Sequence, residues 1–423
     1  MARGRAHRRL LRALCALGLV TAVLTACGGD DGGTPTLTWY TFPEPSGAFA
    51  AAAQQCSDAS GGRYRIEIAE LPTTADGQRE QLVRRLAAED SDVDIMFMDV
   101  IWTAEFAEAG WLRPFEERVA DEISRGVLEG PLRTATYQDR LWGAPITSNT
   151  QLLWYRKDRV DEVPETWDQL IRTAEALPEG ERLVQAQGLR YEGLTVWFNA
   201  LLTSDGGAVL EGEGAEPRVT IGDERTVRAL EILRDFSTSD AADPSLSSND
   251  ENTGRLAFQT GSSSFMVNYP FVYPSAREEA PDVFEQMAWA RYPGVEEGTP
   301  SRPPLGGGNL GIGAFTNHPD LAVDAVRCLI QPELQVRYAT DGGLPPTQAR
   351  LYDDPHLRES YPFADLLRES IDEAGPRPVT PAYNDISRVI YTTIHPTRSI
   401  DPEGDAETLR DQVEKAVKSE GLL

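Results

Sequence analysis

From Pro35 onward the chain alternates short apolar strands with helical segments, and this alternation is the feature that most constrains its fold. The segment 63–70 alternates apolar and polar residues with a period of two, as a half-buried strand does, and the segment 78–88 has helical spacing. Strands that alternate with helices indicate an α/β architecture. The predicted strands are 36–40, 63–70, 93–100, 152–155, 263–268 and 309–315, and the predicted helices are 49–56, 78–88, 102–109, 255–260 and 406–417.

Two passages predict that the chain crosses between two lobes. Residues 141–158 carry Pro145 between two strand patterns, and the Pro/Gly-rich passage 293–308 comes just before another strand. A chain of 423 residues also exceeds what one hydrophobic core usually serves. We therefore expect two lobes with a cleft between them. Their expected segments are 36–146 and 307–358 for lobe 1, and 147–306 and 359–423 for lobe 2.

The first 26 residues have the pattern of an export signal. Five arginines precede an apolar stretch at 13–24, which is too short for a hydrocarbon core that needs about 20 residues. Leu24-Thr25-Ala26-Cys27 resembles a bacterial lipobox, so we expect cleavage before Cys27 and lipid on its thiol. Residues 27–35 are then a flexible tether, and the protein is held on the outer face of the cell membrane. An ordinary secretory signal with an incidental cysteine is the alternative.

The charge balance excludes several classes of partner. The chain has 40 Lys and Arg against 67 Asp and Glu, and a net charge of −27. Such a surface repels phosphate backbones and anionic headgroups, so nucleic-acid binding and electrostatic adsorption to membranes are not expected. A neutral or cationic ligand is compatible with it.

The cysteines leave one pairing to consider. Cys15 lies in the expected signal and Cys27 is the expected lipid site, so Cys56 and Cys328 remain. Outside the cytoplasm two remaining thiols favour a disulfide. Two buried free thiols are the alternative.

Motifs for metal, cofactor or covalent chemistry do not fit their contexts. Residues 306–311 satisfy G-x-G-x-x-G, but a Pro-rich segment precedes them and a strand pattern follows, whereas a dinucleotide fingerprint needs a strand before and a helix after. The histidines beyond the signal do not pair at metal-ligand spacing. We therefore expect no cofactor, no metal and no catalytic residue. Among 67 carboxylates a glycosidase pair is not excluded, so a lipid-anchored glycoside hydrolase is the alternative class.

Aromatic and polar side chains gather at the ends of the predicted strands. A sugar needs a flat apolar face for its ring and carboxylates, amides or guanidinium for its hydroxyls. Arg377 lies between two prolines, in a segment that cannot be helical, and glycines at 307 and 308 allow a close backbone approach. Asp99 is a candidate ligand group or, alternatively, a cap for the helix that follows. The other carboxylate and amide candidates are Glu44, Asn149 and Glu251.

In this order and spacing, the segments resemble the family-1 extracellular solute-binding proteins of bacterial ABC sugar importers over nearly the whole chain beyond the signal. The resemblance is carried by Trp-Gly-Ala-Pro at 142–145, Leu-Trp-Tyr-Arg-Lys-Asp at 153–158, Leu-Ala-Phe at 256–258 and Gly-Gly-Asn-Leu-Gly-Ile at 307–312. Residues 99–111 and 149–156 are most similar to the trehalose-recycling lipoproteins of mycobacteria within this family.

The resemblance implies a periplasmic-binding-protein-like fold, with two α/β lobes built from discontinuous segments and hinged about a central cleft. It implies capture of trehalose or a close α-linked disaccharide, with maltose, maltodextrin or another sugar as the alternative. The implied partners are two membrane permease subunits and a cytoplasmic ATPase, with the binding protein itself a monomer. It also strengthens the pairing of Cys56 with Cys328. The implied sugar-binding residues are Asp99, Asn149, Glu251, Arg377, Tyr269 in place of an indole, Gly307 and Gly308, with Glu44 and Ser46 in a loop of different length.

Overall fold

The computed structural model describes residues 33–212 and 217–418. The expected signal peptide and the lipid site at Cys27 lie outside these residues. The compact unit of the chain begins at Thr36. Within the described residues, no helix is long and apolar enough to cross a membrane.

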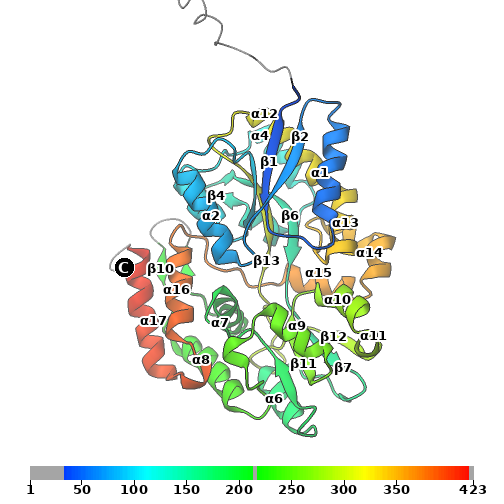
Figure 1. The fold of residues 1–423 in the computed structure, drawn as a ribbon. Helices are drawn as coiled ribbons and strands as arrows, with labels where there is room; N and C mark the ends of the chain where they lie inside the picture. Colours follow the sequence, from blue (N-terminus) through cyan, green and yellow to red (C-terminus); the bar gives the residue numbers. More distant parts are fainter. Residues whose placement is uncertain (1–32, 213–216, 419–423) are drawn as a thin grey trace, which may run out of the picture. The chain divides into compact units, whose positions relative to one another are not determined.

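The first lobe is built on a five-stranded sheet in the order β2-β1-β3-β13-β6 (Figure 1). Strand β1 runs parallel to β2 and β3, whereas β13 runs antiparallel to β3 and β6. Three of these strands come from the start of the chain, and β13 returns to the sheet after a long excursion. The bounds are β1 Thr36–Thr41, β2 Arg65–Glu70, β3 Ile95–Asp99, β6 Gly143–Asn149 and β13 Gly306–Ile312.

Both faces of this sheet are covered, which explains why β3 is apolar from Ile95 to Met98, before it ends at Asp99. Ile95 and Phe97 face the core under α1 (Ala48–Ala59), α12 (Pro319–Leu329) and α13 (Pro332–Gly342). Met96 and Met98 face the opposite core, which contains Leu82 and Leu86 of α2 (Ala75–Ala87). Successive strand residues point to opposite faces, so a single strand serves both helical layers.

The second lobe is built on a four-stranded sheet in the order β12-β7-β11-β8. Strand β7 (Leu152–Arg156) runs antiparallel to β11 (Ser263–Asn268) and β12 (Met287–Ala290), and β11 is parallel to β8 (Leu183–Gln185). One face packs on α7 (Glu192–Ser204), α8 (Glu224–Thr238) and α17 (Pro402–Val417), and the other on α10 (Val272–Glu279) and α15 (Ala364–Asp372).

The remaining elements connect or cover these layers. The helices are α3 (Thr103–Glu108), α4 (Glu117–Ser124), α5 (Glu129–Thr134), α6 (Trp167–Glu175), α9 (Glu251–Gln259), α11 (Pro281–Phe284), α14 (Pro355–Ser360) and α16 (Tyr383–Thr393), the short strands are β4 (Thr136–Tyr137), β5 (Arg140–Leu141), β9 (Leu210–Glu211) and β10 (Arg218–Val219), and the 3-10 turns are η1 (Leu246–Ser248), η2 (Ala349–Asp353) and η3 (Thr397–Ser399).

The chain passes between the two sheets at several places. Strand β6 of the first sheet leads through Thr150 and Gln151 into β7 of the second, and the segment after β12 leads back into β13. A third passage lies between α13, which packs in the first lobe, and α15, which packs on the second sheet. After α15, Gly375 forms a parallel bridge with Pro304 of the returning segment. The expectation of an α/β architecture, with sheets assembled from discontinuous segments, is confirmed.

Element boundaries differ from the sequence prediction in two instructive places. Strand β13 begins at Gly306 rather than 309, because its glycines pair with β6 although glycine disfavours strands. Helix α9 begins at Glu251 rather than 255, because the Asp250 side chain accepts a hydrogen bond from Thr253 N and caps the helix. The strand predicted at 263–268 has those bounds in the structure.

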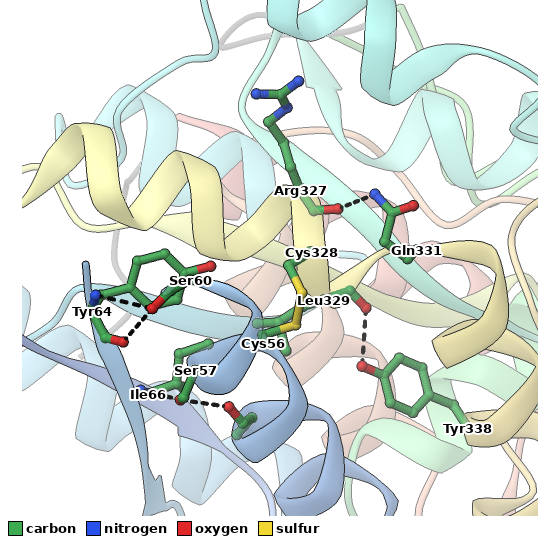
Figure 2. Close-up of a disulfide and its surroundings, with 11 residues drawn as sticks. Cys56, Ser57, Ser60, Tyr64, Ile66, Arg327, Cys328, Leu329, Gln331 and Tyr338 are labelled. Carbon is green, nitrogen blue, oxygen red and sulfur yellow. Dashed lines mark hydrogen bonds between the residues drawn. A yellow bond between two sulfur atoms is a disulfide. The ribbon is translucent and has the colours of Figure 1, made fainter. Parts of the chain in front are cut away.

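A disulfide joins two helices of the first lobe (Figure 2). Cys56 on α1 is bonded to Cys328 on α12, with Cα atoms 5.8 Å apart and a sequence separation of 272. Near it, Ser57 Oγ accepts a hydrogen bond from Ile66 N at 2.8 Å, and Tyr338 Oη donates to Leu329 O at 2.9 Å (Figure 2). The bond fastens the first helix of the lobe to a helix from the returning part of the chain.

Candidate ligand-binding site

A cavity of about 510 Å³ is lined by residues of both lobes. Its walls combine aromatic rings, carboxylates and glycine backbone with a single guanidinium. The lining residues are Phe42, Thr73, Thr74, Ala75, Asp76, Gln78, Phe97, Asp99, Thr147, Asn149, Leu189, Tyr191, Glu192, Gly193, Val196, Asp250, Glu251, Tyr269, Gly306, Gly307, Leu344 and Arg377.

Six residues singled out from the sequence line this one cavity. Three of them lie at strand ends, because Asp99 closes β3, Asn149 closes β6 and Tyr269 directly follows β11. Glu251 is the first residue of α9, and Gly307 lies in β13. The sixth, Arg377, lies in the extended segment between α15 and α16.

Arg377 links the two lobes. Its side chain is only 5% exposed, and its Nη1 donates to Glu192 Oε1 at 2.6 Å. Its Nη2 lies 3.3 Å from Asp99 Oδ1 at the end of β3 and 3.4 Å from Leu305 O. The guanidinium therefore lines the cavity and contacts one carboxylate from each lobe, Asp99 of the first lobe and Glu192 of the second.

Asp99 does not cap the helix that follows it. Its Oδ1 accepts from Ile101 N at 3.2 Å, in addition to the contact with Arg377. Helix α3 has Trp102 at its N-cap and no side-chain cap. The carboxylate is 27% exposed, so it is held by the protein on one side and open to the cavity on the other.

Burial shifts the ionisation of several lining groups. Desolvation raises the pKa of Glu251, and the hydrogen bond from Tyr191 opposes this shift. Burial and the nearby Glu251 carboxylate raise the pKa of Tyr269, so its phenol stays neutral. Desolvation also raises the pKa of Asp76 at the start of α2, against the opposing effect of Arg79. A charged group without a partner is therefore unfavourable in this cavity. Hydrogen-bond donors of a polar ligand suit its carboxylate oxygens.

Gly307 needs to be glycine because of its backbone and its neighbours. Its φ is +121°, and a Cβ there would lie 2.3 Å from Thr147 O. A Cβ on Gly308 would lie 2.0 Å from Cζ of Phe97. Gly308 therefore makes room for the Phe97 ring, which lines the cavity, while Gly308 itself is not among the lining residues.

Glu44 and Ser46 lie at the start of α1 rather than in the cavity lining. Glu44 Oε2 accepts from Ala48 N at 2.8 Å, and its Oε1 accepts from Ser46 N at 2.8 Å. Ser46 Oγ accepts from Ala48 N at 3.2 Å. In this structure both side chains are engaged with the free N–H groups of the helix.

Several lining residues were not predicted from the sequence, most notably Glu192 and Tyr191. Glu192 is 8% exposed and begins α7, every residue of which is buried. The sequence does carry a signal for it, since most residues of this helix are apolar and predict that it is buried, together with the acid at its first position. The residues 73–78 at the start of α2 carried no comparable signal.

Metal coordination finds no support in the described part of the chain, where no group of three or more His, Cys, Asp or Glu side chains is arranged to hold an ion. The donors that do converge are a guanidinium, an amide and hydroxyl groups. The site is therefore built for hydrogen bonding.

Comparisons with known proteins agree on one family. The model of the bacterial extracellular solute-binding protein family matches residues 70–336, more than half of the chain. A probable ABC transporter-binding protein of Deinococcus radiodurans is 26% identical over 377 residues, which are 84% of this chain and 87% of that protein. A maltotriose-binding protein of Pyrococcus abyssi is 24% identical over 278 residues, 64% of this chain and 58% of that protein.

Among solved structures, maltose-bound MalE3 of T. maritima is similar over 90% of this chain and 99% of its own, with a TM-score of 0.81 and 26% identity. This likeness confirms the expected periplasmic-binding-protein-like fold.

Proposed function

The chain belongs to the family of bacterial extracellular solute-binding proteins, and we propose that its cleft captures trehalose, or a close α-linked disaccharide, for an ABC transporter. The protein then delivers the sugar to two permease subunits in the membrane, driven by a cytoplasmic ATPase. In this proposal the chain makes and breaks no bond.

The observation that carries the proposal is the convergence of Asp99, Asn149, Glu251, Tyr269 and Arg377 on one cavity from both lobes. Carboxylate oxygens accept hydrogen bonds from sugar hydroxyls, and the Asn149 amide and the Arg377 guanidinium donate to hydroxyl oxygens. The cavity volume of about 510 Å³ falls within the usual range for small-molecule sites.

Each group has a distinct part in this proposal. The neutral Tyr269 ring offers an apolar face to a pyranose ring and a hydroxyl to its rim. Gly307 brings backbone close to the sugar, because no side chain stands in the way. Asp99 and Arg377 already contact each other across the lobes, so a sugar that joins them ties the two lobes together.

Maltose or a maltodextrin is the second candidate ligand. It is favoured by two relatives whose names give their ligands, the maltotriose-binding protein of Pyrococcus abyssi and maltose-bound MalE3 of T. maritima. The same cavity groups can hydrogen-bond to either sugar. Direct titration with both sugars therefore decides which one the protein prefers.

Calorimetric titration of the chain from Gly28 onward, with trehalose, maltose and sucrose in turn, tests the proposal. We expect stoichiometric binding of trehalose and weaker heats from the other two. A stronger maltose signal would keep the transport role and change the ligand, and silence with all three sugars would refute the proposed function. Release of monosaccharide on long incubation would favour the hydrolase alternative.

We also propose that the two lobes close over the sugar by hinge bending where the chain passes between the sheets, with lobe 1 formed by 36–146 and 307–358 and lobe 2 by 147–306 and 359–423. Small-angle scattering should then show a smaller radius of gyration after sugar is added. An unchanged radius at saturation would count against closure.

The lipid anchor on Cys27 and the position on the outer face of the membrane are further parts of the proposal. Labelled palmitate should enter the wild-type protein and not the Cys27→Ala variant. Equal labelling of both proteins would contradict the assignment. Sedimentation of the chain from Gly28 onward should give a monomer.

A further inference from the structure

The first residues of α7 contact two charged groups of the cavity that come from other elements, Glu251 and Arg377. Tyr191 is the N-cap of this helix, Glu192 is its first residue and Gly193 its second. All three line the cavity. Neither the sequence motifs nor the family relationship gives them a role.

Tyr191 holds Glu251. Its Oη donates to Glu251 Oε2 at 2.6 Å. Glu251 lies at the start of α9, where Asp250 supplies the cap, and its carboxylate also interacts with its own backbone N–H. The hydrogen bond from Tyr191 fixes the direction of this partly buried carboxylate, which lines the cavity.

Gly193 makes the position of Tyr191 possible. A Cβ on Gly193 would lie 2.2 Å from Tyr191 Oη and 2.3 Å from its Cζ. The phenol thus folds back over its own helix, into space that any larger residue would fill. The φ of Gly193 is not in the left-handed region, so alanine is compatible with the backbone and would displace only the tip of the Tyr191 side chain.

Glu192 holds Arg377. Its Oε1 accepts from Arg377 Nη1 at 2.6 Å and from Tyr383 Oη at 2.6 Å, and its Oε2 accepts from Ser387 Oγ. Tyr383 and Ser387 both lie on α16. Both Glu192 oxygens accept hydrogen bonds from protein groups. Glu192 therefore acts on a ligand through the Arg377 guanidinium and not by direct contact.

We propose that Tyr191, Glu192 and Gly193 are positioning residues that preset Glu251 and Arg377 for the ligand. This inference rests on the proposed function, since it assigns how the same site is organised. The first residues of α7 orient both the Glu251 carboxylate, which accepts hydrogen bonds, and the Arg377 guanidinium, which donates them. Neither side chain then has to be ordered when the ligand binds, which lowers the entropic cost of binding.

A pair of Tyr→Phe variants tests the Tyr191 contact. Tyr191→Phe should weaken binding of trehalose, or of maltose if wild type prefers it, by about tenfold. The matched control is Tyr137→Phe, since Tyr137 Oη also donates to a glutamate, Glu108, at 3.0 Å, away from the cavity. The control should bind the sugar like wild type.

A double-mutant cycle separates positioning from general damage. If Tyr191 acts through Glu251, then Tyr191→Phe should cost little further affinity in a Glu251→Gln background. Additive losses would mean that Tyr191 acts by another route and would overturn its assignment.

A pair of Gly→Ala variants tests Gly193. Gly193→Ala should weaken binding by about as much as Tyr191→Phe, while its thermal midpoint stays level or rises, because alanine favours a helix over glycine. The control is Gly254→Ala in α9, where a Cβ would meet only Gln185 Cβ at 3.5 Å, and its affinity should not change. Wild-type affinity in Gly193→Ala would overturn this part of the inference.

A graded pair of variants tests Glu192. Glu192→Gln keeps one acceptor for Arg377 and should bind the sugar better than Glu192→Ala, which keeps none. Equal affinities in the two variants, with both folded by circular dichroism, would overturn the role of Glu192. If wild type binds and every variant binds like it, the positioning role alone fails. If wild type binds no sugar at all, the proposed function fails first and takes this inference with it.

Discussion

Removal of the Cys56–Cys328 disulfide gives the most quantitative test of how the first lobe is held together. The bond closes a loop of 272 residues. In the loop-entropy model, a loop of that length lowers the entropy of the unfolded chain by about 19 cal/mol/K, which is about 5.6 kcal/mol at 25 °C. Native disulfides usually contribute about 2–4 kcal/mol, so we expect Cys56→Ala/Cys328→Ala to lose about 2–5 kcal/mol.

Urea unfolding measures this loss. With an m-value of about 3 kcal/mol/M, the midpoint should fall by roughly 0.7–1.7 M relative to oxidised wild type. Wild type treated with a reductant should move toward the variant. Sugar affinity is the internal control, because neither cysteine lines the cavity, and it should stay at the wild-type value. Equal midpoints for the oxidised protein and the cysteine-free variant would refute the reasoning.

Substitutions at three further positions test the site and the core. Asp99→Ala should reduce sugar affinity ten- to a hundredfold, since loss of a charged hydrogen-bond partner costs about 1.5–3 kcal/mol, and unchanged calorimetric binding would remove Asp99 from the site. Tyr269→Ala should lose the stacking face while Tyr269→Phe keeps it, so equal affinities in the two variants would argue against stacking. Burial raises the pKa of Asp94, which is 3% exposed, so its contribution to stability is present below about pH 4 and is lost as the pH rises. Asp94→Asn should therefore gain stability relative to wild type between pH 4 and pH 7, and a constant difference in urea midpoint over that range would contradict this.

Part of the site could be predicted from the sequence, because several of its residues lie where strands end. Asp99, Asn149 and Tyr269 were predicted because each stands where a strand stops. Asp99 and Asn149 end strands of the first sheet, whereas Tyr269 follows a strand of the second sheet and reaches the cavity from the other lobe. Strand β11 was predicted with its observed bounds, since Gly261 and Pro270 frame an apolar run.

Other parts depend on contacts that a local pattern does not encode. The start of β13 was missed because glycine gives no periodic signal, and the need for Gly308 arises only from the Phe97 ring of a distant strand. The sequence places Glu192 at the start of a buried helix, but its contacts with Arg377 and with Tyr383 of α16 arise only from the packing of distant segments. Glu44 was predicted as a carboxylate near a strand end and Ser46 from the family resemblance. In the structure both side chains accept hydrogen bonds from backbone N–H groups at the start of α1.

A crystal structure of the protein with trehalose tests the central claim most directly, namely that the cleft between the lobes binds a disaccharide through Asp99, Glu251 and Arg377. We predict one trehalose in the cavity, with hydroxyls in hydrogen-bond contact with both carboxylates and the guanidinium and a ring face on Tyr269. Trehalose bound elsewhere, or an empty cleft in crystals grown at saturating sugar, would contradict it.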